Sequence, residues 1–142
     1  MRYAFAVLLL IAAMLSAQVM EDTEHYRDAS ALYGLIVGQG HRCVVNVMSN
    51  DYGVPNYMVL FLGNFSDSGG LERFLTAVVA TAVVSESATW SSNALLVMFD
   101  DTWLSIPTAD CRYLQNNYTR MTETQLETWI LANVVSAPNP NQ

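Results

Sequence analysis

The chain has 142 residues and a net charge of −7, and all six of its basic residues are arginines. This length allows one domain with a substantial core. The acidic balance argues against nucleic acid and against electrostatic attachment to anionic lipid, because both require clustered Lys and Arg. Charged residues make up only 13% of the chain, which excludes a wholly disordered acidic chain. The lack of lysine excludes Schiff-base and P-loop lysine chemistry.

Residues 1–17 have the pattern of a secretory signal peptide. Arg2 forms a short positive region, an uninterrupted apolar run extends from Ala4 to Ala13, and Ala17 supplies a small residue before a cleavage site. The run is short for a bilayer-spanning helix, which needs about 20 residues. We therefore expect a cleaved leader and export to the periplasm or the extracellular space. The alternative is an uncleaved membrane anchor formed by residues 4–17.

Removal of this leader changes the composition of the remaining chain. The leader holds 15 of the 74 apolar residues, so the rest is 47% apolar, an ordinary share for a globular domain. Because Arg2 is the one charged residue in the leader, the net charge becomes −8. In an oxidising compartment Cys43 and Cys111 are expected to form a disulfide, with two buried thiols as the alternative.

The first half of the chain predicts a helix, a strand pair and a second helix. Residues 21–37 carry apolar side chains at steps of three and four and predict a helix, with a strand over 31–37 as the alternative. Residues 42–48 and 57–62 predict antiparallel strands joined by a turn-rich loop. Residues 71–83 have helical periodicity but are apolar around much of the helix. This pattern indicates burial on more than one side, against a sheet or in a dimer.

The second half predicts another strand pair and a final helix. Residues 94–99 and 103–106 read as a hairpin. Residues 109–116 are consistent with a short helical turn or an edge segment. Residues 123–135 predict the last helix, and the proline- and asparagine-rich tail, residues 136–142, is predicted to be disordered.

Together these elements predict a single α+β domain over residues 18–135, in the order α-β-β-α-β-β-α. One antiparallel sheet of about four strands is expected, with three helices packed on it. Ser66, Asp67 or Ser68 is expected to cap the second helix, and Thr122 the last.

The sequence offers one weak metal-site candidate. Glu21, His25 and Asp28 are spaced so that all three share a helix face, and imidazole with carboxylates can bind a divalent ion. A solvated acidic face is the favoured interpretation. We expect no metal and no cofactor.

No catalytic constellation emerges from the sequence. His41 and Cys43 form an H-x-C unit, but alternate residues on a strand are poorly placed to form a thiol–imidazole pair. Neighbouring carboxylates at Asp100 and Asp101 are typical of turn chemistry. Gly69-Gly70 lacks a P-loop pattern and is interpreted as a flexible turn.

Aromatic side chains suggest contact with a partner. Tyr52 and Trp90 fall in predicted loops and Trp103 opens a strand, so these three are the candidate partner-binding residues. Asn64 and Asn117 begin N-x-S/T triplets, which are glycosylation sites only in a eukaryotic secretory pathway.

The sequence therefore predicts a small exported, non-enzymatic binding or assembly protein. Its expected partner is a protein, a peptide or a second copy of itself, and it contacts a membrane only during export or if the leader is retained. The alternatives are an exported hydrolase that uses carboxylates or His41, and an anchored envelope component.

Overall fold

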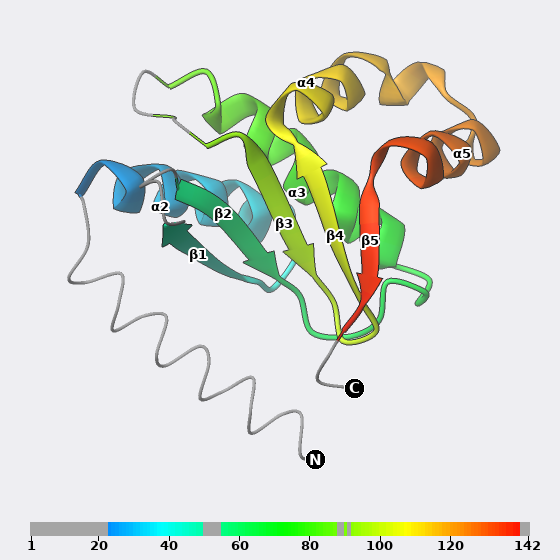
Figure 1. Ribbon diagram of the computed structural model, residues 1–142, viewed down its shortest axis with the longest axis horizontal. Coiled ribbons are helices and arrows are strands. Elements are labelled where there is room, and N and C mark those ends of the chain that lie inside the picture. Colours follow the sequence, from blue (N-terminus) through cyan, green and yellow to red (C-terminus); the bar gives the residue numbers. More distant parts are fainter. Residues whose placement is uncertain (1–22, 50–54, 88–89, 91, 140–142) are drawn as a thin grey trace.

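The computed structural model describes residues 23–49, 55–87, 90 and 92–139, which form one mixed sheet packed against helices (Figure 1). The strands are β1 (Val44–Ser49), β2 (Pro55–Leu60), β3 (Ala94–Met98), β4 (Thr102–Pro107) and β5 (Val135–Pro138). The helices are α2 (Thr23–Gly38), α3 (Gly70–Val84), α4 (Thr108–Asn117) and α5 (Glu123–Asn133), with the 3-10 turn η1 (Tyr118–Arg120) before α5. None of these helices is long and apolar enough to cross a bilayer.

The α+β class is confirmed, but the sheet is mixed and has five strands in the order β1-β2-β3-β4-β5. The pairs β1–β2 and β3–β4 are antiparallel, as predicted. Strands β2 and β3 are parallel, with Tyr57 opposite Leu95, so the prediction of a purely antiparallel sheet is wrong. The reason is the connection between them, because α3 crosses the sheet face and returns the chain in the same direction.

The C-terminal segment corrects a second prediction. Residues 136–138, expected in a disordered tail, belong to strand β5 and pair with β4, with Ser136 opposite Leu104. All four side chains of β5 are exposed, so the sequence of this segment lacks the apolar alternation that indicates a strand. Backbone pairing and a hydrogen bond from Thr102 Oγ1 to the Ala137 carbonyl (3.0 Å) hold it to the sheet edge.

The helices largely follow their sequence signals. Helix α2 is helical to Gly38, which rejects the alternative strand over residues 31–37, and residues 109–116 lie in α4. Four helices are therefore described where three were expected. Thr122 caps α5 as predicted, in a reciprocal capping box with Gln125.

The cap of α3 is different from the expected one. Gly69 occupies the N-cap position, and no side chain makes a capping hydrogen bond. The Asp67 carboxylate instead accepts a hydrogen bond from the Asn64 N–H (3.0 Å), within the preceding loop. Ser66 and Ser68 therefore do not serve as caps either.

The core lies between the helices and one face of the sheet. Alternate residues of the central strands, including Tyr57 and Val59 on β2 and Leu95 and Val97 on β3, are fully buried on this face. Helices α2, α3, α4 and α5 all contribute to the same cluster. Figure 1 shows α3 crossing behind the strands at the centre of this layer.

Glycine is required at position 70, the first residue of α3, because the backbone of the preceding loop approaches it closely. A Cβ atom at this position would lie 1.9 Å from the Phe65 carbonyl oxygen, whereas a Cβ at Gly69 would meet nothing within 4 Å. The interpretation of Gly69-Gly70 as a flexible turn is therefore wrong for Gly70. Its lack of a side chain lets the loop pack onto the helix start.

We expect Gly70→Ala to lower the free energy of unfolding by about 2 kcal/mol, because the added methyl forces the backbone apart. Urea titration followed by circular dichroism measures this change. Gly69→Ala is the matched control and is expected to change stability by less than about 0.5 kcal/mol. Equal midpoints for both variants would contradict the argument.

Candidate functional site

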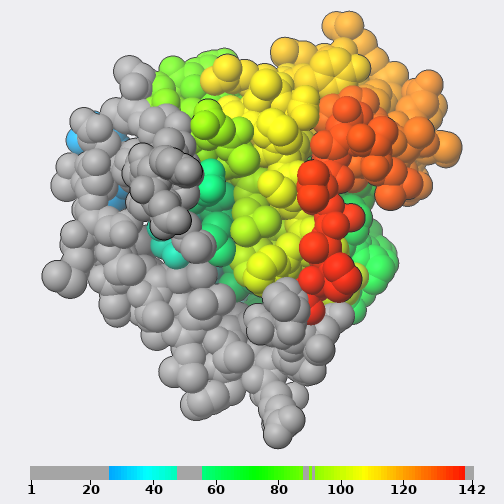
Figure 2. Space-filling view, in the orientation of Figure 1, coloured from blue at the N-terminus to red at the C-terminus, as the bar shows by residue number. Residues whose placement is uncertain are grey.

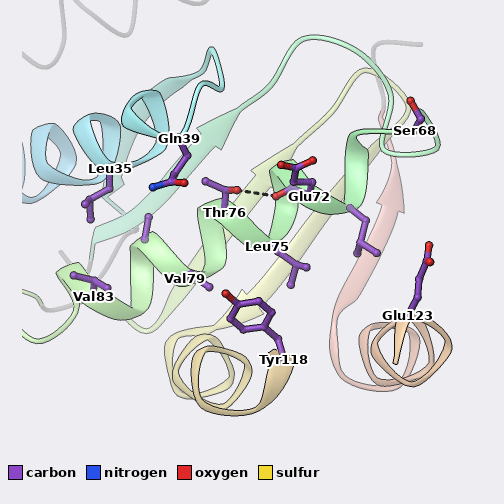
Figure 3. A pocket seen from close by; sticks show the side chains of 12 residues that line it. Leu35, Gln39, Ser68, Glu72, Leu75, Thr76, Val79, Val83, Tyr118 and Glu123 are labelled. Atoms are coloured by element: carbon purple, nitrogen blue, oxygen red, sulfur yellow. Dashed lines mark hydrogen bonds between the residues drawn. The ribbon is translucent and has the colours of Figure 1, made fainter. Parts of the chain in front are cut away.

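A groove of about 550 Å³ lies over the outer face of α3 (Figure 3). Its floor is a row of apolar side chains at four-residue spacing, which places them on one face of a helix. Leu35 of α2 and Tyr118 of η1 border this row on either side. The row consists of Leu71, Leu75, Val79 and Val83.

The groove exists because α3 is apolar on two faces. Phe74, Ala77 and Val78 are fully buried against the sheet and the other helices. Leu75 and Val79 of the groove row directly follow Phe74 and Val78, and the row is therefore turned toward the edge of the core, where its side chains are only partly buried. Val83 is 43% exposed and Leu35 is 41% exposed, which leaves an apolar surface open to solvent.

Polar residues form the rim of this groove. Gln39, Ser68, Glu72, Thr76 and Glu123 line it, and no arginine does. The Thr76 hydroxyl donates to the Glu72 carbonyl at 2.8 Å and is therefore satisfied within the helix. The Glu72 and Glu123 carboxylates give the rim a negative charge.

A second hollow of about 540 Å³ lies beside the groove, between α2 and the end of α3. Leu35 and Val83 line both hollows, so the apolar surface is continuous between them. Arg27 and Asp28 both line the second hollow, so its lining contains one basic and one acidic residue.

The weak metal candidate is not assembled among the described residues. Glu21 and the side chain of His25 lie outside what the structure describes. Asp28 is buried rather than on a solvated face, and the Tyr57 hydroxyl donates to its carboxylate at 3.5 Å. The described part of the chain contains no group of three His, Cys, Asp or Glu side chains suited to a metal ion.

His41 and Cys43 do not form a reactive pair in the structure. The His41 Nε2 atom lies 3.8 Å from the Glu72 carboxylate, at the end of the groove. Cys43 packs against the hydrophobic core. Burial raises the pKa of the Cys43 thiol to about 11, which makes it a poor nucleophile at neutral pH.

Cys43 and Cys111 are both free cysteines in the structure, and the disulfide between them stays a prediction. Cys43 precedes β1 at one edge of the sheet, whereas Cys111 lies on α4, which follows β4 and contacts it. The pKa of the Cys111 thiol is raised to about 12, mainly by burial and further by Asp110, against a smaller lowering by Arg112. Both thiols thus lie among or against the apolar side chains of the core.

Asp100 and Asp101 hold the loop that leads into α3. Asp100 Oδ2 accepts a hydrogen bond from the Gly63 N–H at 2.9 Å, and Asp101 Oδ1 accepts one from the Phe65 N–H at 2.7 Å. Asp101 Oδ2 accepts from both the N–H and the hydroxyl of Ser66. These carboxylates are thus engaged in positioning backbone, and no described hydrogen bond or ion pair joins them to His41.

The hydrogen bonds also set the acidity of Asp101. Partial burial acts to raise the pKa of this carboxyl, but the bonds from Phe65 and Ser66 outweigh burial and lower the pKa below its ordinary value. The ionised form is therefore the one that fits the loop.

The three candidate aromatic residues have different positions. Tyr52 lies outside the described residues. Trp90 stacks on the buried Tyr57 ring at 4.3 Å and donates its indole N–H to Ser92, so it packs against the core rather than serving as a free anchor. Trp103 lies on the sheet face opposite the helices, and its indole nitrogen has no hydrogen-bond partner among the described residues.

None of the residues singled out as partner-binding or metal-binding candidates lines the main groove. Its one signal in the sequence is the apolar circumference of residues 71–83, which predicted burial on more than one side. The comparisons add no relative, because no protein-family model, curated protein or solved structure matches the chain.

We expect Asp101→Asn to destabilise the fold by about 1 kcal/mol at pH 7, because it weakens charge-assisted hydrogen bonds that water partly screens. The folded-state pKa of Asp101 is lowered, so its contribution is present above the ordinary aspartate pKa of about 3.9 and is lost as pH falls through the folded-state value. Urea unfolding is measured for the wild type and the variant from pH 7 to pH 3. The difference between their free energies of unfolding is expected to become smaller as the pH falls. The control Glu127→Gln, on an exposed residue, is expected to show none, and a difference independent of pH would contradict this role of Asp101.

Proposed function

We propose that this chain is a small exported, non-enzymatic binding protein that receives an amphipathic helix of a partner protein in the α3 groove. The observation that carries the proposal is the apolar row on α3, which is only partly buried and is bordered by acidic residues. Exposed apolar surface of this kind is typical of interaction sites.

The lining of the groove favours a helix over an extended peptide. An extended peptide gains affinity by pairing its backbone with a free strand edge. This groove is formed mainly by side chains of helices, whose backbone groups are already paired within each helix. A helical partner satisfies its own backbone and needs only an apolar stripe. The row from Leu71 to Val83 spans 12 positions, or about 18 Å, which matches a partner helix of three to four turns.

The charge of the rim defines the partner further. Glu72 and Glu123 lie beside the apolar row, and the chain as a whole is strongly acidic. A complementary helix therefore carries Lys or Arg on either side of its apolar stripe. Complementary charge of this kind raises the association rate and disfavours acidic competitors.

The binding test uses a synthetic amphipathic helical peptide with a leucine stripe and lysine flanks. Fluorescence anisotropy is expected to show saturable binding to the wild type, weakened at least tenfold by Val83→Asp, or about 1.4 kcal/mol. Val83 is already exposed, so the substitution leaves the core intact. Added salt is expected to weaken binding, because the flanking charges are solvent-accessible.

Two controls isolate the groove. Leu131→Asp changes a leucine that is 84% exposed and lies outside the groove, so it is expected to leave binding unchanged. A peptide of the same stripe with glutamate flanks is expected to bind more weakly. Equal binding by wild type and Val83→Asp would overturn the proposal. So would a dimer of the wild type that Val83→Asp dissociates, because the groove would then be an interface between two copies.

The export part of the proposal rests on residues 1–17 and has a direct test. Mass spectrometry of the protein from the exported fraction of its native cell is expected to find an N-terminus at Gln18. A protein that keeps Met1 or Arg2 and sediments with membranes would instead support the anchored alternative.

A further inference from the structure

Helix α2 ends in a glycine turn that places His41 beside the groove. Gly40 has a φ of +88°, the left-handed conformation in which glycine commonly closes a helix. Its N–H donates to the Val37 carbonyl at 2.9 Å, and the His41 N–H donates to the Ile36 carbonyl at 3.4 Å. This pair of bonds is the Schellman pattern, so the backbone of His41 is fixed against the last turn of the helix.

The His41 side chain reaches one of the carboxylates of the groove rim. Its Nε2 atom lies 3.8 Å from Glu72 Oε1. The Glu72 side chain is 76% exposed and lines the groove together with Gln39 (Figure 3). Figure 2 views the molecule from the other side, on which β3, β4 and β5 lie in front. Glu72 thus stands between His41 and whatever occupies the groove.

Among the described residues, Glu72 is the charged group in contact with this imidazole. Arg42, the next residue along the chain, is exposed, and Arg73 of α3 directs its guanidinium to carbonyls of the β2–α3 loop. Helix α2 has no basic residue in its last turn, so its C-terminal carbonyls keep their partial negative charge. An imidazolium at position 41 therefore meets negative charge from Glu72 and from the helix end.

We propose that protonation of His41 weakens the binding of a basic partner helix, so that the groove holds its partner at neutral pH and releases it in acid. The inference rests on the proposed function, since it concerns the regulation of the same groove. When the imidazole is neutral, the Glu72 carboxylate is available to pair with Lys or Arg of the partner. When the imidazole takes up a proton, it pairs with Glu72 and offsets that charge at the rim. Release of the partner is thus coupled to the uptake of a proton from solvent.

The composition of the chain makes such a switch easy to assign. Histidine is the side chain that ordinarily titrates between about pH 5 and pH 8, and the chain contains two, His25 and His41. Carboxylates ordinarily titrate near about pH 4 and lysine above about pH 10, so the charge of a lysine-flanked peptide is constant between pH 7.5 and pH 5.5. A change in affinity across this interval therefore reports on one of the two histidines or on the N-terminal amine.

Fluorescence anisotropy with the lysine-flanked peptide and the full 142-residue chain tests the switch. The dissociation constant of the wild type is expected to rise about threefold from pH 7.5 to pH 5.5, an effect of the size typical of one solvent-exposed charge pair. His41→Gln is expected to give the same dissociation constant at both pH values. His25→Gln, which removes the other histidine, is the matched control and is expected to keep the pH dependence of the wild type.

The outcomes separate this inference from the proposed function. A pH dependence that persists in His41→Gln, or a wild-type affinity that is equal at both pH values, would overturn the switch. The groove would remain the binding site in either case, provided that Val83→Asp still weakens binding. A wild type that shows no saturable binding at pH 7.5 would overturn the proposed function and the switch together.

A second measurement needs no peptide. Urea unfolding of the wild type, His41→Gln, Glu72→Gln and the double variant gives the coupling between the two side chains. The ion pair forms only when the imidazole is protonated, so the coupling is expected at pH 5.5 and is lost as the pH rises to 7.5. Additive effects of the two substitutions at pH 5.5 would overturn the switch, whatever the peptide does.

Discussion

The fixed position of the loop between β2 and α3 is the constraint on which the rest of the structure depends. The loop, residues 61–69, is held by Arg73 of α3 and by the turn between β3 and β4. The Arg73 guanidinium donates to the Leu62 and Asn64 carbonyls, and the turn at Asp100 and Asp101 accepts the backbone N–H groups that follow. Because α3 starts where this loop ends, these contacts determine how α3 is rotated about its axis.

That rotation decides which apolar face of α3 becomes core and which becomes groove. Phe74 is placed inward by its edge-on contact with Phe65 of the loop, at 5.9 Å between ring centres. Phe65 also lies against Phe99, over which the Arg73 guanidinium is stacked. The same aromatic cluster thus joins the loop, the helix and the end of β3, and leaves Leu75 and its row only partly buried.

The sequence predicted the elements better than their arrangement. Periodicity located three of the four described helices and the first four strands, because apolar spacing reports which side of an element is buried. It left residues 109–116, which lie in α4, open between a helical turn and an edge segment. It could not show that β2 and β3 are parallel, since the direction of a strand does not affect its alternation. Strand β5 was missed because its side chains are all exposed. The backbone hydrogen bonds that pair it with β4 do not require a particular amino-acid composition.

The sequence predicted the candidate site only in part, for a similar reason. Residues 71–83 revealed an excess of apolar surface, but their own sequence does not state which side meets the sheet. That choice comes from loop contacts up to 37 positions apart, such as that of Asp100 with Gly63. Asp100 and Asp101 were correctly predicted to be turn residues. Their hydrogen bonds to the distant loop at Gly63 and Phe65 are visible only in the tertiary structure.

The use of arginine explains why the groove rim remains acidic. Arg73 directs its guanidinium to three carbonyls around the loop, and Arg112 donates to both the hydroxyl and the carbonyl of Ser85 at the end of α3. A planar guanidinium can reach several acceptors at once, whereas the ammonium of lysine is a compact point charge. Two of the six basic residues thus fasten the two ends of α3, and neither lines the groove beside Glu72 and Glu123. The interactions that orient the helix therefore also leave the acidic rim without an arginine among the described residues that line it.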